Sequence, residues 1–126
     1  MFNISIKENI LLGKKVHPAR QVKILKGLRI HNFITNLEVI YGDSGTNLSA
    51  GQLQRIRLAR GVMQDSEIYL LDEPFNGIDK ENKDRIITFL KEFFHNKTVI
   101  IISHHKDELR FFDQIFEMQN GILKRV

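Results

Sequence analysis

The stretch IYLLDEP, residues 68–74, decides the fold, because it sets an unbroken apolar run directly before two carboxylates. A continuous apolar run of this length is expected of a β-strand that is covered on both faces. The two carboxylates, Asp72 and Glu73, then fall at the carboxyl end of that strand. Open α/β sheets bind their ligands at this end of their strands. We therefore expect Asp72 and Glu73 to lie at a functional edge of the sheet.

A helix is predicted to begin at the stretch LSAGQ, residues 48–52. Ser49 and Gln52 form the pattern S-x-x-Q, in which each side chain satisfies a free backbone N–H group at the start of the helix. This cap does not explain Gly51, since glycine in a helix costs up to about 1 kcal/mol relative to alanine. Free N–H groups at a helix N-terminus attract phosphate, and glycine lets a ligand approach the backbone closely. The turn is therefore a candidate phosphate site.

The remaining sequence alternates between helical and strand patterns. The apolar spacing between residues 18 and 37 predicts two short helices broken near Gly27, and residues 41–47 are typical of a loop. Further along we expect a helix capped by Asp79, a second buried strand at residues 98–103, a short helix at residues 106–112, and a hairpin of residues 115–118 and 122–126 around Asn120-Gly121. From residue 68 onward, this order predicts an α/β fold with parallel strands.

His104 follows the strand predicted at residues 98–103 and lies 31 residues beyond Glu73. This interval is long enough for one crossover helix, so both side chains are expected at the same edge of the sheet. An acidic pair that ends one strand and a histidine that ends another also occur without any function, and the spacing alone leaves that alternative open. The other single histidines show no ligand spacing and are predicted to be surface residues: His17, His31 and His95.

Composition excludes several classes of protein. The 126 residues suit one domain, and the absence of cysteine excludes disulfides, cysteine-based zinc sites and thiol catalysis. The net charge of +4 is spread among acidic residues without a sustained basic block, so no nucleic-acid partner is expected. The longest aliphatic run, residues 99–102, is far shorter than the roughly 20 residues that span a bilayer. The first residues lack the pattern of a signal peptide, which favours a cytoplasmic protein.

As a set, these motifs resemble the C-terminal part of an exporter-type ATP-binding-cassette (ABC) transporter nucleotide-binding domain. LSAGQ is similar to the signature motif of that family, with Ala50 where glycine is usual, and IYLLDE is similar to its Walker B strand. His104 matches the switch histidine. Three further stretches carry the resemblance: residues 2–10 follow the pattern found after the glutamine loop, residues 41–45 the exporter loop that touches the coupling helices, and residues 76–79 the D-loop.

The resemblance implies a fold and a set of roles. The fold would be a partial P-loop NTPase fold, with a mostly parallel sheet and flanking helices, in which residues 1–47 belong to the helical subdomain and residues 48–126 to the ATPase core. Ser49 and Gly51, with Ala50 and Gln52 in the same turn, would bind the γ-phosphate of an ATP held mainly by the opposite subunit. Asp72 would organise Mg²⁺, Glu73 would be the catalytic base, His104 would contact the γ-phosphate, and Asp79 would communicate across the dimer.

The phosphate-binding P-loop of this family is missing from the chain. A P-loop needs the pattern G-x-x-x-x-G-K-[ST]. The single Gly-Lys pair, Gly13-Lys14, has Glu8 in place of the first glycine and Lys15 in place of the hydroxyl residue. The sequence resembles a domain cut just after its glutamine loop. By this resemblance the P-loop strand would lie in mid-sheet, next to residues 98–103, so we expect an open sheet edge and no ATPase activity in the isolated chain.

The favoured hypothesis is an ATP-hydrolysing subunit or fragment of an exporter-type ABC transporter. It would lie at the cytoplasmic face of the membrane through a transmembrane domain and would pair with a second nucleotide-binding domain. It would be either a truncated domain or one that a separate P-loop-bearing polypeptide completes. One alternative is a non-catalytic fragment that docks on a transporter. The other, a lobe of a nucleic-acid-associated ABC ATPase, is disfavoured by the exporter-like loop and the lack of coiled-coil heptads.

Overall fold

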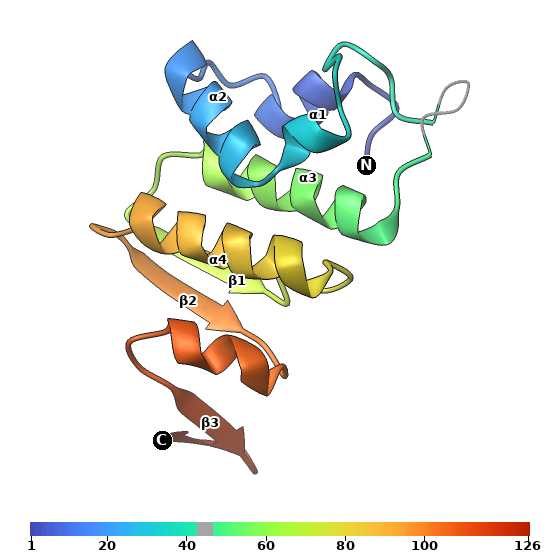
Figure 1. Cartoon of the computed structure of the whole chain (residues 1–126). Coiled ribbons are helices and arrows are strands. Elements are labelled where there is room, and N and C mark those ends of the chain that lie inside the picture. Colours follow the sequence, from blue (N-terminus) through green and yellow to red (C-terminus); the bar gives the residue numbers. More distant parts are fainter. Residues whose placement is uncertain (43–46) are drawn as a thin grey trace.

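The computed structural model of the chain describes residues 1–42 and 47–126, so residues 43–46 of the predicted loop lie outside the described part. The first half of the chain is helical, and from residue 68 onward strands and helices alternate up to a C-terminal hairpin (Figure 1). The elements are α1 (Ile6–Leu11), α2 (Pro18–Gly27), η1 (Ile30–Asn32), α3 (Ala50–Met63), β1 (Ile68–Asp72), α4 (Lys80–Phe93), β2 (Thr98–Ile102), η2 (Lys106–Phe111), β3 (Phe116–Gln119) and β4 (Ile122–Arg125). None of the helices described here has the length and apolar character needed to cross a membrane.

Local caps and one buried asparagine hold the N-terminal helices. Ser5 and Glu8 form a capping box at the start of α1. Asn9 is fully buried, and its Nδ2 donates to three backbone carbonyls in the first residues of the chain. α2 ends at Gly27, where an added Cβ would overlap the ring of Phe89 in α4. The 3₁₀ turn η1 follows, which confirms the predicted break near Gly27.

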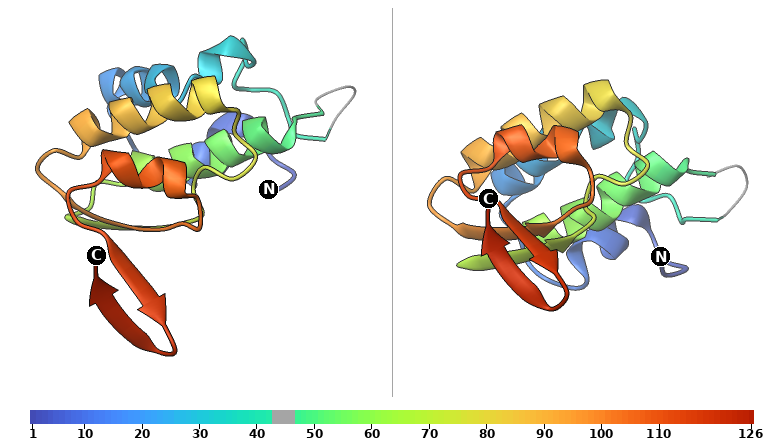
Figure 2. Two further views of the ribbon diagram at one scale, coloured as in Figure 1. Left: turned by 60° about the horizontal axis from the view of Figure 1, so that its bottom comes forward. Right: turned by 90° about the horizontal axis from the view of Figure 1, so that it is seen from below.

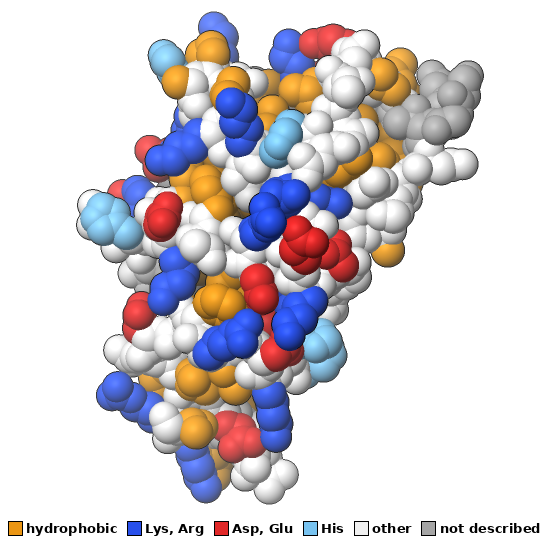
Figure 3. Space-filling view, in the orientation of Figure 1, with side chains coloured by type: hydrophobic (Ala, Val, Ile, Leu, Met, Phe, Trp, Pro, Cys, Tyr) orange, Lys and Arg blue, Asp and Glu red, His pale blue; other side chains and the backbone are white. Residues whose placement is uncertain are grey.

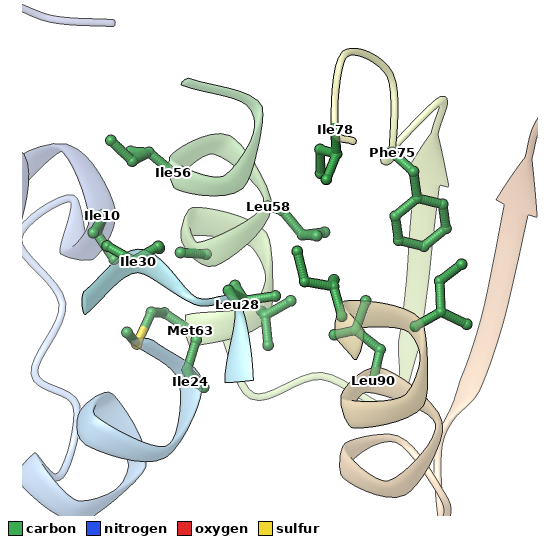
Figure 4. Close-up of a cluster of buried hydrophobic side chains, with 14 of the residues drawn as sticks. Ile10, Ile24, Leu28, Ile30, Ile56, Leu58, Met63, Phe75, Ile78 and Leu90 are labelled. Atoms are coloured by element: carbon green, nitrogen blue, oxygen red, sulfur yellow. The ribbon is translucent and has the colours of Figure 1, made fainter. Parts of the chain in front are cut away.

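One apolar core joins the N-terminal helices to the sheet, and α3 runs through its middle (Figure 4). Ile56 of α3 lies toward α1 and η1, whereas Leu58 of the same helix lies toward Phe75 in the loop after β1 (Figure 4). α2 packs against both α3 and α4. The fully or almost fully buried apolar side chains include Ile6, Ile10, Ile24, Leu28, Ile30, Ile56, Ala59, Val62, Met63, Ile86 and Ile87. Residues from both halves of the chain therefore share one core.

The strands β1 and β2 form a parallel pair joined by α4 as the crossover helix. The pairing runs from Ile68 opposite Thr98 to Asp72 opposite Ile102. The parallel strand–helix–strand unit predicted from the sequence is therefore present. The register brings the carboxyl ends of the two strands to the same edge, where Asp72 ends β1.

The prediction that both strands are covered on both faces is wrong. Ile68 and Leu70 of β1 are 60% and 73% exposed, and Ile100 and Ile102 of β2 are 52% and 61% exposed. The alternating residues face the helices, and Tyr69 among them is buried. Successive strand residues point to opposite faces, so helices on one side of the sheet bury only every second residue. Nothing among the described residues covers the other side, which we call the open sheet face: Ile68, Leu70, Ile100 and Ile102.

The predicted C-terminal hairpin is confirmed, but its first strand does not join the parallel sheet. β3 pairs with β4 in antiparallel fashion, and these two strands form a sheet of their own. Asn120 and Gly121 have φ angles of 50° and 76°, as the tight two-residue hairpin turn requires. The hairpin projects away from the rest of the molecule (Figure 2). Its apolar side chains are therefore exposed: Phe116, Met118, Ile122, Leu123 and Val126.

Surface charge is mixed on the face drawn in Figure 3, where basic side chains alternate with acidic ones. Exposed ion pairs of the chain include Lys7 with Glu38 and Arg85 with Glu81. This face carries no continuous basic patch of the kind that binds nucleic acid.

Candidate active site

The first turn of α3 carries the predicted cap. The Ser49 Oγ accepts from the backbone N–H of Gln52 at 3.2 Å, and the Gln52 Oε1 accepts from the backbone N–H of Ser49 at 2.9 Å. Both hydrogen bonds of the capping box are present. Ser49 and Ala50 are exposed, whereas Gly51 and Gln52 are half-buried. The turn therefore presents part of its backbone to the surface.

Gly51 has a packing reason that the sequence did not reveal. A Cβ on Gly51 would overlap the backbone carbonyl oxygen of Gly77, in the loop between β1 and α4. Gly77 has a φ of 75°, which glycine adopts without strain. The start of α3 and the loop of residues 76–79 are thus packed backbone to backbone. A close approach does require this glycine, and in the structure the approaching group is this loop.

Glu73 follows β1 in a conformation that is rare for its residue type. Its φ of 46° lies in the left-handed region, which costs a non-glycine residue roughly 1 to 3 kcal/mol. Three hydrogen bonds hold it there. The Glu73 N–H donates to the Ile102 carbonyl at 2.9 Å, and Gln54 Nε2 of α3 donates to the carbonyls of Glu73 and Pro74 at 3.2 and 3.1 Å. Strained residues held in this way are concentrated at functional sites.

Glu73 and His104 meet at the shared edge of β1 and β2, as their spacing in the sequence predicted. Glu73 Oε1 and His104 Nδ1 lie 2.5 Å apart. The His104 side chain is 69% exposed and that of Glu73 is 27% exposed, so a ligand can reach both. Asp72, which ends β1 beside them, is exposed. The structure therefore brings a carboxylate and an imidazole together and leaves a second carboxylate open to solvent.

His105 is a site residue that the sequence analysis missed. Its Nε2 lies 3.0 Å from Asn76 Oδ1, and its ring centroid lies 4.1 Å from that of His104. The two histidines therefore both reach the loop that follows β1, His104 through Glu73 and His105 through Asn76. The doubled histidine at residues 104–105 was the only signal for this pair in the sequence.

A buried carboxylate supports the turn that carries the two histidines. Glu108 is 1% exposed, and its Oε2 accepts from Ser103 Oγ at 2.6 Å. Ser103 Oγ in turn accepts from the His105 N–H at 3.1 Å. Lys83 of α4 donates to Glu108 Oε1 at 3.3 Å and to Asp107 Oδ2 at 2.7 Å. The hydrogen bond to Asp107 is the main reason that the pKa of Lys83 is raised, and the same bond lowers the pKa of Asp107.

Asp79 is the N-cap of α4, as predicted. Its Oδ1 accepts from the Asn82 N–H at 3.0 Å, and its Oδ2 accepts from Asn82 Nδ2 at 2.7 Å. These bonds, the side-chain bond first, lower the pKa of the Asp79 carboxyl. Desolvation lowers the pKa of the Arg55 guanidinium, and the Asp79 charge opposes that shift in part. Asp79 therefore has a structural role whatever else it does.

The family description "ABC transporter" matches residues 2–76, which is more than half of the chain. The chain belongs to the ABC transporter family. It is 34% identical over 126 residues to human "ATP-binding cassette sub-family C member 4", covering 96% of this chain and 10% of that protein. It is 35% identical over 127 residues to the "ATP-dependent lipid A-core flippase" of Acinetobacter baylyi, covering 96% of this chain and 22% of that protein.

A third ABC relative is the "Beta-(1-->2)glucan export ATP-binding/permease protein NdvA" of Brucella abortus. It is 32% identical over 133 residues, covering 98% of this chain and 21% of that protein. The chain thus spans about a tenth to a fifth of the length of these relatives. The family match includes the LSAGQ stretch and β1 but ends before Asp79 and His104. Both residues lie within the longer alignments, which leave out only a few residues of the chain.

Proposed function

We propose that this chain is the part of an exporter-type ABC transporter ATPase that carries the catalytic base. The observation that carries this proposal is the 2.5 Å contact between Glu73 Oε1 and His104 Nδ1 at the carboxyl edge of β1 and β2. The exporter class is supported by the relatives that are named a flippase and an export ATP-binding/permease protein. The proposed reaction is hydrolysis of ATP, coupled to transport across a membrane.

In this proposal Glu73 is the general base. Its Oε1 is engaged by His104, so its Oε2 remains to accept a proton from the attacking water. The three backbone hydrogen bonds around Glu73 fix the direction from which it acts. His104 uses Nδ1 for Glu73 and keeps Nε2 for a γ-phosphate oxygen. The pair therefore links the base to the phosphate that is being transferred.

Mg²⁺ prefers oxygen ligands, and the exposed Asp72 carboxylate at the end of β1 suits it. When bound with ATP, this ion neutralises charge on the phosphate oxygens. Ser49 and Gly51, with Ala50 and Gln52, would present the start of α3 to the γ-phosphate of an ATP held by the opposite subunit. The positive end of the α3 dipole favours that contact.

The proposed dimer contact runs through the loop of residues 76–79. Asp79 would carry communication across the dimer. The contact of Gly51 with Gly77 supports this role. It joins the turn proposed to bind phosphate at one ATP site to the loop of residues 76–79, which follows the catalytic residues of the other ATP site. A second nucleotide-binding domain is thus a required partner.

A lobe that bears the P-loop is also required, since these 126 residues contain no P-loop. The open sheet face supports such a partner, because it consists of four aliphatic side chains that are more than half exposed. Covering them would contribute about 1 to 2 kcal/mol for each side chain. We propose that the P-loop-bearing lobe, in the same or another polypeptide, covers this face. Residues 1–47 would then belong to the helical subdomain and residues 48–126 to the core, with a transmembrane domain holding the assembly at the cytoplasmic face of the membrane.

The test is an ATPase assay on the chain alone and after addition of a separately produced lobe that bears the P-loop. The chain alone should neither bind ATP tightly nor hydrolyse it, because the P-loop backbone and lysine cradle the phosphates. The mixture should hydrolyse ATP. Micromolar ATP binding by the monomeric chain would contradict the need for a second lobe. Binding of the lobe without any hydrolysis would instead favour the non-catalytic docking fragment.

A further inference from the structure

Three potential metal ligands converge at the edge of the parallel sheet. Glu73, His104 and His105 each offer one ligand atom, and these atoms all lie within 4.8 Å of one another. In a tetrahedral site with metal–ligand bonds of 2.0–2.1 Å, ligand atoms lie about 3.3 Å apart. Glu73 Oε1 and His104 Nδ1 are already 2.5 Å apart, so the distance to be closed is that between this pair and the His105 ligand atom, and rotation of the imidazole side chains would close it.

The support around these ligands is of the kind that metal-binding histidines use. Such a histidine usually donates its second ring N–H to an oxygen atom, which fixes the orientation of the ring. His105 has this partner in Asn76, because its Nε2 lies 3.0 Å from Asn76 Oδ1 and Nδ1 then carries the lone pair. The backbone of His105 is held by Ser103, and Ser103 by the buried Glu108. The backbone of Glu73, which supplies the carboxylate ligand, is also held by hydrogen bonds, to the Ile102 carbonyl and from Gln54.

Two imidazoles and one carboxylate select a particular class of ion. Zn²⁺ binds nitrogen and carboxylate oxygen well, and three protein ligands with one water form its usual open site. Mg²⁺ prefers oxygen ligands and seldom uses imidazole. This ligand set is therefore distinct from the Asp72 carboxylate proposed for Mg²⁺. The half-buried Glu73 and the exposed His104 leave room for a water as the fourth ligand.

We propose that Glu73, His104 and His105 form a Zn²⁺ site at the carboxyl edge of β1 and β2. The ion would bind between Glu73 Oε1 and His104 Nδ1 in place of their hydrogen bond, and the His105 ring would move toward it. Bound there, Zn²⁺ inhibits the ATPase, since it occupies the base and the histidine at once. The inhibition rests on the proposed function, whereas the binding of the ion does not.

The binding test uses the 126-residue chain with Co²⁺ as a spectroscopic probe and Zn²⁺ as the competitor. We expect one ion per chain, visible Co²⁺ absorption of the tetrahedral type, and its loss when Zn²⁺ is added. His105→Ala should weaken Zn²⁺ binding at least tenfold, and Asn76→Ala by about 10- to 100-fold, as expected for a residue that orients a ligand. His95→Ala is the matched control, because His95 is an exposed histidine beyond the end of α4. It should leave binding unchanged.

Three outcomes would overturn the proposal: no saturable binding, binding that survives both His104→Ala and His105→Ala, or equal weakening by His95→Ala. The exposed His104 ring makes its variant safe for folding, and circular dichroism checks this. Inhibition is measured separately, on the chain reconstituted with a P-loop-bearing lobe. There, Zn²⁺ should slow hydrolysis by the unaltered assembly, and His105→Ala should reduce that inhibition when each rate is compared with the rate of the same assembly without the ion. If the chain binds Zn²⁺ but the reconstituted assembly does not hydrolyse ATP, the Zn²⁺ site is supported and only the proposed function is refuted.

Discussion

Gly51 in the first turn of α3 lies against the backbone carbonyl of Gly77, so closely that a single added methyl group would overlap that oxygen. This contact joins two stretches that the sequence separates by an entire helix and strand. The LSAGQ turn and the loop of residues 76–79 must therefore move together. In the dimer proposed above, this contact would carry changes at one ATP site to the other.

Gly51→Ala should destabilise the chain by about 1 to 3 kcal/mol, because the added methyl group has no space and the backbone of Gly77 cannot yield easily. Denaturant unfolding followed by circular dichroism measures the change. Gly61→Ala in the same helix is the control, since no neighbouring atom lies within 4 Å of the place its methyl group would take. That variant should be neutral or more stable by up to about 1 kcal/mol. Equal effects at the two glycines would contradict the contact.

Glu108→Ala should be among the most damaging single substitutions. It removes a fully buried carboxylate and leaves the Ser103 hydroxyl without its acceptor, whereas Lys83 keeps its bond to Asp107. An unsatisfied buried polar group costs roughly 1 to 3 kcal/mol. Glu108→Gln keeps the hydrogen bond from Ser103 and should cost less. Thermal unfolding ranks the two variants. If the Glu108→Ala variant had the same melting temperature as the unaltered chain, the network would not be supporting the turn that carries His104.

The Asp79 cap should give stability that depends on acidity. Its pKa is lowered in the folded chain, so the stabilisation is present above the ordinary carboxyl pKa and is lost as the pH falls through the lower folded value. Asp79→Ala should cost about 0.5 to 2 kcal/mol at neutral pH. It should cost less once the pH has fallen below the lowered pKa of this carboxyl in the folded chain. Asp79→Asn keeps a capping side chain that does not titrate. Unfolding curves at several pH values should therefore show no acid-dependent loss from this residue in the Asn variant.

The isolated chain should self-associate through the open sheet face. Leu70 and Ile100 lie opposite each other in register and are 73% and 52% exposed. An exposed apolar surface beside unpaired strand edges promotes aggregation. Leu70→Lys combined with Ile100→Glu adds an opposite-charge pair across the strands and should raise the monomer fraction in light scattering coupled to size exclusion. Val22→Lys, on the surface of α2, is the control and should not. A monodisperse unaltered chain would contradict this expectation.

Spacing predicted that Glu73 and His104 lie at the same edge of the sheet, because the carboxyl ends of parallel strands joined by a crossover helix share an edge. It did not predict that the two side chains are in contact. The sequence also predicted the helix caps at Ser49 and Asp79, since each cap depends on residues three positions apart. The sequence did not predict the open sheet face. The apolar run at residues 68–71 predicted cover on both faces of the strand, whereas among the described residues the helices cover only one.

Other features of the site depend on tertiary packing. The role of Glu108 depends on the position of η2, which brings this side chain to Ser103 after β2 and to Lys83 of α4. No local sequence pattern indicates these contacts. His105 was overlooked because adjacent strand residues normally point apart, whereas the chain leaves the strand before this pair and the two rings lie side by side. The packing of Gly51 against Gly77 likewise joins segments that meet only in the folded chain.

The central claim is that Glu73 is the catalytic base of a composite ATPase, and the Glu73→Gln variant tests it most directly. The measurement is steady-state ATP hydrolysis by the chain reconstituted with a P-loop-bearing lobe, with nucleotide binding measured on the same samples. Because glutamine keeps the shape but cannot accept a proton, hydrolysis should fall by about 10²- to 10⁴-fold while ATP binding persists. Turnover close to that of the unaltered assembly, with ATP binding intact, would contradict the assignment of Glu73 as the base.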